Sequence, residues 1–118
     1  MSDVVSWNIR LSVQDGKLDE ARALMAEMVE ATKQEAGALG YEWFLSPDGT
    51  TCHINERYAD SAATLEHLGN FGANFAERFL ACFAPTGLHV YGEPSDEVRG
   101  VLDGLGAVYL GTLGGFTR

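Results

Sequence analysis

The sequence predicts an α+β fold of the ferredoxin-like plan, with the element order β-α-β-β-α-β and an antiparallel sheet. Two patterns support this prediction. Stretches with apolar residues at every second position, typical of half-buried strands, alternate with stretches whose apolar residues recur every three or four positions, typical of amphipathic helices. The length of 118 residues matches a single domain. Within it we expect a core over residues 4–93 and an extension over residues 94–118.

The first half of the chain contains the clearest patterns. Residues 4–13 alternate strictly and predict a strand. Residues 18–33 have helical spacing, and Gly37 is expected to end that helix in a left-handed conformation. Residues 39–46 and 50–58 are extended segments joined by a Pro-Asp-Gly turn, so they predict a β-hairpin.

The second half predicts the remaining two elements of the plan. A helix is expected from residue 61 through Phe83, with an irregularity or break at Gly69 and Gly72, because glycine weakens a helix interior. Residues 88–92 predict the fourth strand. A short helix and an apolar, glycine-rich tail follow in the extension, and such a tail is expected to cover another surface, for example that of a partner subunit.

The composition excludes several classes of function. The chain has 17 acidic and 8 basic residues and a formal charge of -9, which disfavours nucleic acid and anionic membranes as partners. Its apolar runs are shorter than the roughly 20 residues of a membrane helix, and its first residues do not resemble a signal peptide. We therefore expect a cytoplasmic protein.

Metal and cofactor motifs are not found in the sequence. The three histidines, His53, His67 and His89, lie on separate predicted elements without metal-ligand spacing. Cys52 and Cys82 are expected to be reduced and structural. No glycine-rich loop follows a strand and opens a helix, as a dinucleotide or flavin site would require. The sequence therefore predicts neither a metal nor a bound cofactor.

Two segments and one histidine resemble the antibiotic biosynthesis monooxygenase family. The segments are Glu-Ala-Gly-Ala-Leu-Gly-Tyr, which ends at Tyr41, and Cys-His-Ile-Asn-Glu-Arg-Tyr, which ends at Tyr58; a helix with His67 follows. In that family a helix ends at Glu-x-Gly, strands follow, and a Glu precedes a helix that bears a His. The resemblance covers roughly residues 4–91 and implies a dimeric α+β barrel, in which two sheet faces close on each other. The chain departs from the family at Tyr58, where Trp is common.

Two ionisable residues are the strongest candidates for chemistry. His67 lies at the border of an apolar helix stripe, where an imidazole could exchange a proton near neutral pH. Glu56 shares a strand face with Ile54, so its charge needs a partner, and His67, Arg57 and Arg10 are the candidates. Both residues match family positions. The alternative interpretation is that they form only a structural ion pair.

Further candidates come from the strands and from the second helix. Asn8 lies on the polar side of the first strand, and the resemblance implies that it touches a substrate or oxygen; a solvent-facing or barrel-interior hydrogen bond is the alternative. Aromatic side chains could line a flat substrate pocket or belong only to the core. The substrate-binding candidates are Trp43, Tyr58, Tyr41, Phe71 and Phe75.

The resemblance and the residues together lead to one functional hypothesis. The expected protein is a homodimer that oxygenates a small aromatic phenol or quinol without a cofactor. His67 would remove a proton, and Asn8, Trp43 and Tyr58 would orient the substrate. The alternatives are a non-oxidative isomerase or decarboxylase, a non-catalytic dimeric binding module, and the haem-degrading branch, for which no axial histidine is evident.

Overall fold

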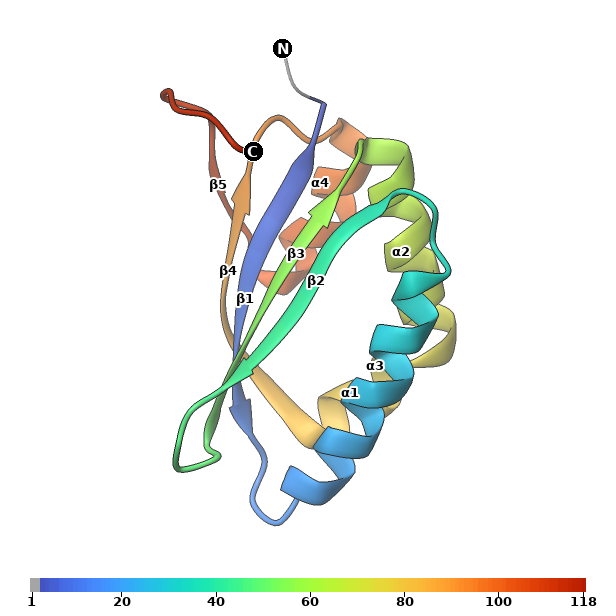
Figure 1. Cartoon of the computed structure of the whole chain (residues 1–118), viewed down its shortest axis with the longest axis vertical. Coiled ribbons are helices and arrows are strands. Elements are labelled where there is room, and N and C mark those ends of the chain that lie inside the picture. Colours follow the sequence, from blue (N-terminus) through green and yellow to red (C-terminus); the bar gives the residue numbers. More distant parts are fainter. Residues whose placement is uncertain (1–2) are drawn as a thin grey trace.

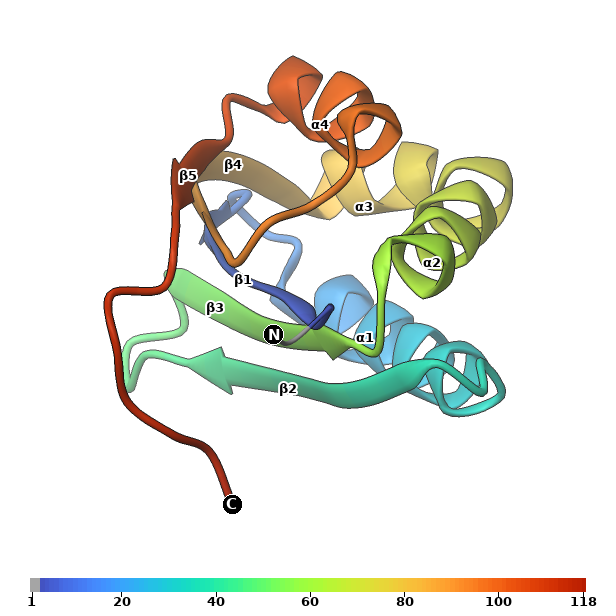
Figure 2. The same cartoon turned by 90° about the horizontal axis from the view of Figure 1, so that it is seen from above.

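The α+β class predicted from the sequence is confirmed by the computed structural model, which describes residues 3–118. The helices within these residues cover one face of a five-stranded sheet (Figures 1 and 2). The α-helices and strands are β1 Val5–Val13, α1 Leu18–Lys33, β2 Ala38–Leu45, β3 Thr51–Tyr58, α2 Ser61–Asn74, α3 Ala76–Cys82, β4 Phe83–Tyr91, α4 Asp96–Leu102 and β5 Val108–Leu110. A single 3-10 turn, Asp103–Leu105, follows α4.

The strand order is β2-β3-β1-β4-β5, so β1 lies at the centre of the sheet. It pairs antiparallel with both β3 and β4, and β2 forms the predicted hairpin with β3. This is the arrangement expected of a ferredoxin-like plan. The short β5 is an addition that the sequence did not predict; it pairs parallel with β4 and extends that edge of the sheet.

The predicted alternation of β1 is confirmed by its burial. Trp7, Ile9 and Leu11 are buried beneath the helices, and the residues between them point to the other side. The face without helices is called the open face below (Figure 2). It has polar residues on β1 and β3. The residues at its hollow include Ser6, Asn8, Arg10, Gly40, Glu42, His53, Asn55, Arg57 and Tyr91.

The sequence predicted a second helix as far as Phe83 with a break at Gly69 and Gly72, and both its end and the position of its break were wrong. The helix is continuous through Gly69 and Gly72 and breaks at Phe75, whose φ of -130° is not helical. The chain becomes extended at Phe83, because β4 pairs with β1 as far as that residue. Pro85 fits in this strand because the register shifts beside it, between Arg10 and Leu11, and a bulge tolerates a residue without an N–H.

The left-handed conformation expected at Gly37 was also wrong. The helix α1 ends at Lys33, and the described glycines with positive φ do not include Gly37. What requires glycine here is space, because a Cβ on Gly37 would overlap the Cβ of Ala63 on α2. The close approach brings the turn after α1 against the first turns of α2.

The extension after residue 93 packs partly on the sheet and helices. Val98 and Leu102 of α4 are fully buried. Tyr109 of β5 donates a hydrogen bond to Asp103 Oδ1 at 2.6 Å. Beyond β5 the tail runs on the side of the sheet opposite the helices (Figure 2), and its Leu113 and Phe116 are exposed. None of the helices within residues 3–118 has the length and apolar content needed to cross a bilayer.

We predict that Gly37→Ala destabilises the protein by about 1–3 kcal/mol, because the new methyl group must displace Ala63 from a packed contact. The matched control is Gly69→Ala, where a Cβ meets no other described residue within 4 Å. That change should be neutral or stabilising by up to about 1 kcal/mol, because alanine favours a helix interior. Urea unfolding of the two variants measures both effects. Equal free energies of unfolding for the two variants would contradict the role given to Gly37.

Candidate functional site

The helix α2 brings His67 to the sheet. Asp60 caps the helix, since its side chain accepts a hydrogen bond from the Ala63 N–H at 2.8 Å. Thr64 donates to the Asp60 carbonyl at 2.8 Å and is fully buried. His67 follows one turn later on the same inward side, and only 6% of it is exposed. The cap and the buried Thr64 therefore fix which way the His67 side chain points.

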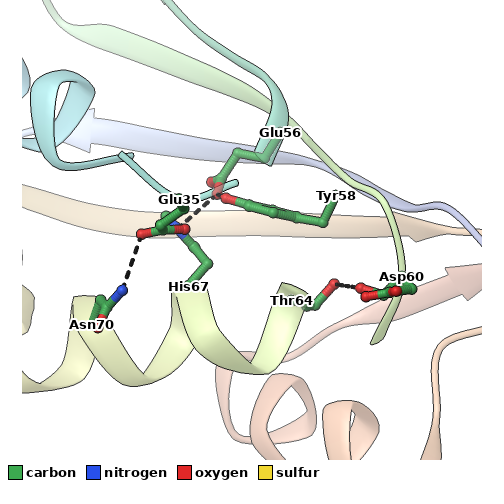
Figure 3. A network of polar contacts seen from close by, with 7 residues as sticks. All are labelled: Glu35, Glu56, Tyr58, Asp60, Thr64, His67 and Asn70. Atoms are coloured by element: carbon green, nitrogen blue, oxygen red, sulfur yellow. Dashed lines mark hydrogen bonds and ion pairs between the residues drawn. The ribbon is translucent and has the colours of Figure 1, made fainter. Parts of the chain in front are cut away.

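His67 lies between two carboxylates, one at each ring nitrogen (Figure 3). Nδ1 is 3.0 Å from Glu35 Oε1, and Nε2 is 3.2 Å from Glu56 Oε1. Each glutamate is only 7% exposed. Such buried charges are costly unless they are paired, so the three side chains depend on one another.

Glu56 has a second partner on its own strand. The Tyr58 hydroxyl donates a hydrogen bond of 2.6 Å to Glu56 Oε1, the same oxygen that faces His67. Both side chains point beneath the helices because β3 alternates as predicted. Of the three partners considered for Glu56, the structure places His67 beside it.

Glu35 was not predicted as a site residue. The sequence marked it only as part of the Glu-x-Gly helix end. In the structure it lies in the turn after α1, where its Oε2 accepts a hydrogen bond of 3.3 Å from the Asn70 side chain (Figure 3). The Glu-x-Gly motif was the sequence feature that could have marked Glu35 as a site residue. Its Gly37 lets the turn after α1 come close enough to α2 for Glu35 to reach His67.

The environment shifts the pKa values of the ionisable side chains around His67. Burial by itself lowers the pKa of His67, but the hydrogen bonds and charges of Glu56 and Glu35 outweigh it, and the pKa lies above its ordinary value. Burial and the charge of Glu56 raise the pKa of Tyr58 and of Tyr41, so both phenols are neutral near pH 7. The two glutamates thus stabilise the charged form of His67 relative to an exposed imidazole.

An apolar cavity of about 80 Å³ opens beside this network. Glu56 and His67 form part of its wall, together with Tyr41 and Phe71, two of the predicted substrate-binding residues. Its other walls are aliphatic and aromatic side chains from the sheet and the helices: Trp7, Ile9, Met28, Ile54, Leu68, Phe79, Leu80, Pro85, Leu88, Leu102 and Leu105. The cavity is thus an apolar site with an acid–base pair in its wall.

The structure does not bring the other predicted residues to the cavity wall. Tyr58 is fully buried behind Glu56. Trp43 contributes to a separate apolar hollow of about 170 Å³ near the start of α1. Phe75 lies at the helix break with the Arg78 guanidinium over its ring. Asn8 is on the open face, where its side-chain amide donates a 2.7 Å hydrogen bond to Asn55.

The C-terminal extension closes one side of the cavity. Leu102 of α4 is buried in its wall, and Leu105 of the following 3-10 turn is half exposed at its edge. Leu80 of α3 is also half exposed and lies at the same edge. These two leucines mark the mouth of the cavity. The extension lies outside the segments that resemble the family, and its sequence did not predict this role.

The site does not resemble a metal or thiol centre. In the part of the chain that the structure describes, no three His, Cys, Asp or Glu side chains are placed to hold a metal ion. Glu35 and Glu56 bind different nitrogens of one ring, which separates them. Cys52 and Cys82 are buried free thiols, and burial raises the pKa of Cys52 to about 11. Their predicted reduced state agrees with these positions.

Comparison with known proteins places this geometry among related folds. Residues 5–83 match the family model for the antibiotic biosynthesis monooxygenases. The crystal structure of MupZ from Pseudomonas fluorescens is similar over 100% of this chain and 91% of that chain, with 25% identity and a TM-score of 0.88. A comparison with curated protein sequences found no significant match.

Two further structures are similar over most of the chain. SnoaB, a cofactor-independent oxygenase from Streptomyces nogalater, is 16% identical over 80% of this chain and 96% of its own, with a TM-score of 0.68. A putative antibiotic biosynthesis monooxygenase from Nitrosomonas europaea is 15% identical over 79% of this chain and 92% of its own, with the same TM-score. At these identities the two structures show a shared fold.

We predict that stability falls as the pH rises through the folded-state pKa of His67. Folding raises this pKa above 6.5, so the contribution of the charged ring is complete below pH 6.5 and is lost at higher pH. Thermal midpoints between pH 6 and 9 measure this loss, below the range in which the buried tyrosines ionise. His67→Gln should flatten the slope, whereas Glu66→Gln, an exposed change on the same helix, should keep it. Equal slopes in wild type and His67→Gln would contradict the prediction.

Proposed function

The chain belongs to the antibiotic biosynthesis monooxygenase family, and from this premise we propose that it is a cofactor-independent monooxygenase of a small, electron-rich phenol or quinol. The observation that carries the proposal is the buried pair of Glu56 and His67 in the wall of an apolar cavity. A proton acceptor beside an apolar chamber is what the activation of such a substrate requires. The similarity to SnoaB, itself a cofactor-independent oxygenase, supports the proposal.

The proposed reaction begins with proton transfer. The ligand hydroxyl loses its proton to the Glu56–His67 pair, and the resulting phenolate is electron-rich enough to pass an electron to dioxygen. One oxygen atom then forms a bond to the ring carbon, and the other leaves as water. The substrate loses two hydrogens in total, so a phenol and dioxygen give a quinone and water. The protein supplies proton transfer and orientation.

The lining of the cavity favours a neutral, apolar ligand with a hydroxyl group. Two carboxylates and one imidazolium leave the network with a net negative charge, which would repel a carboxylate or a phosphate. The rings of Tyr41 and Phe71 offer faces and edges for an aromatic ligand. A volume of about 80 Å³ is smaller than the roughly 150 Å³ cavity that holds benzene elsewhere. Leu80 and Leu105 must therefore move apart at the mouth for a ring to enter.

We also propose that two copies of the chain pair through their open faces. The face without helices has no cover in the single chain (Figure 2). An antiparallel sheet can leave one face in solvent, but exposed apolar side chains on that face favour its burial against a second layer. Its strands present exposed apolar side chains, Phe44 on β2, Tyr91 on β4, and Val108 and Leu110 on β5. Asn8 lies near the centre of this face, so we place its contribution in the subunit interface. The cytoplasmic location stays a prediction.

We predict that the metal-free, flavin-free protein consumes oxygen with at least one compound in a panel of hydroquinones and polycyclic phenols. Glu56→Gln and His67→Ala should each lower the rate of uptake by about 100-fold or more, because each breaks the pair that takes up the proton, and positioned acid–base groups contribute that much. An oxygen electrode measures the uptake, and chromatography identifies the quinone product.

The control for this experiment is Glu77→Gln, which removes an exposed carboxylate from α3. It should keep the wild-type rate. An absence of uptake with every compound would refute the monooxygenase proposal. Isotope exchange of the ligand's acidic protons without oxygen uptake would instead support a non-oxidative proton-transfer enzyme.

We predict that the protein is a dimer in solution and that Asn8→Arg converts it to a monomer. In the proposed pairing the substitution places two cations near the two-fold axis, where little solvent screens them. Light scattering after size exclusion measures the mass. Asn74→Arg, the same change at the exposed end of α2, should remain dimeric. If light scattering gave the mass of a monomer for the wild-type protein, the proposed interface would be refuted.

A further inference from the structure

The occupancy of the two ring nitrogens of His67 limits what this residue can do. Glu35 Oε1 lies 3.0 Å from Nδ1 and Glu56 Oε1 lies 3.2 Å from Nε2. A neutral imidazole has one N–H and one lone pair, so one of the two contacts would then set a lone pair against a carboxylate oxygen. A doubly protonated ring donates to both. With both glutamates ionised, the geometry therefore favours the imidazolium, which has no lone pair with which to accept a proton from a ligand.

The titratable groups that face His67 come from three elements. The turn after α1 contributes Glu35, β3 contributes Glu56 and Tyr58, and β2 contributes Tyr41, whose ring centroid is 5.6 Å from the imidazole. On α2 itself, Asn70 bonds Glu35. Within residues 3–118 no Lys or Arg forms an ion pair with either glutamate. The two carboxylates are thus the charges that decide the state of the ring.

We propose that Glu35 is the positioning residue of this site: it holds His67 as a doubly protonated ring through Nδ1, so that Glu56, and not His67, takes the proton of the ligand. This inference rests on the proposed function for its chemical step and on the geometry alone for the role of Glu35. Glu35 does not line the cavity, whereas Glu56 and His67 do. It therefore acts through the ring and not on the ligand.

The arrangement around Glu56 fits the role of base. Both of its protein partners in the described chain, the Tyr58 hydroxyl and the His67 ring, reach Oε1. We assign the second oxygen, Oε2, to the ligand, because the described contacts of Glu56 use Oε1 and Glu56 lines the cavity. In the step, an O–H bond of the ligand breaks, an O–H bond forms on Oε2, and the electron pair stays on the ligand oxygen. No electron is exchanged. The new anion then lies close to the imidazolium, which stabilises its charge.

Nitrogen NMR of the full-length protein with labelled histidine tests this proposal without any ligand. The His67 signals are assigned by their loss in His67→Gln, which separates them from those of His53 and His89. We expect both ring nitrogens of His67 to be protonated at pH 6.5 and the ring to titrate above that pH. In Glu35→Gln the titration midpoint should fall by about one pH unit or more, because an adjacent opposite charge has this effect.

Two other variants distinguish the effect of losing the Glu35–His67 ion pair from the effect of removing any nearby negative charge. Glu66→Gln removes an exposed carboxylate next to His67 in the sequence and should leave the midpoint unchanged. Glu35→Asp keeps the charge but withdraws it from Nδ1, so an intermediate midpoint is expected. If Glu35→Gln does not fold, the wild-type titration and Glu35→Asp decide. A wild-type midpoint at or below 6.5, or equal midpoints in Glu35→Gln and Glu66→Gln, would overturn the proposal.

The oxygen assay adds a readout that a purely structural role would not change. With a ligand that is oxygenated, Glu35→Gln should move the pH–rate profile in the same direction as the NMR midpoint, and Glu35→Asp should restore part of the shift. Glu56→Gln should instead lower the maximal rate at every pH. If no compound gives oxygen uptake but the NMR titration behaves as expected, the monooxygenase proposal is refuted and the positioning role of Glu35 stands. A rate profile that Glu35→Gln leaves unmoved refutes that role in catalysis.

Discussion

The structure around the cavity depends on one interaction, the burial of an imidazole between two carboxylates. Each member alone would carry an unpaired charge into the interior, so none can be understood without the others. The three residues also come from three separate parts of the chain: a turn, a strand and a helix. Their pairing therefore joins α2 to the sheet with a polar contact of defined direction, where apolar packing alone would permit small rotations of the helix.

Several local features of the fold serve this contact. The Asp60 cap and the buried Thr64 set the rotation of α2. Gly37 brings the turn after α1 within reach of that helix. The alternation of β3 places Glu56 and Tyr58 on the same side as the helices. Together these features leave His67 a single orientation in the interior.

Much of the fold could be predicted from the sequence, because strands and amphipathic helices leave periodic patterns. The alternation of β1 and the spacing of α1 are examples. The site was predicted only in part. Glu56 and His67 were identified from their types and places, but Glu35 is 32 positions from His67, and only the tertiary approach at Gly37 brings them together. The start of β4 at Phe83 was missed because pairing with β1 overrode a helical pattern.

The mouth of the cavity has a consequence for how this protein can diversify. The ionisable network comes from residues that precede residue 83, within the part that matches the family model. Leu102 and Leu105 come from the extension, beyond that part. Substitutions in the extension can therefore reshape access to the cavity without altering the ionisable network. One side of the cavity is therefore encoded outside the stretch that holds the ionisable network, so evolution or engineering can change that side while the network is preserved.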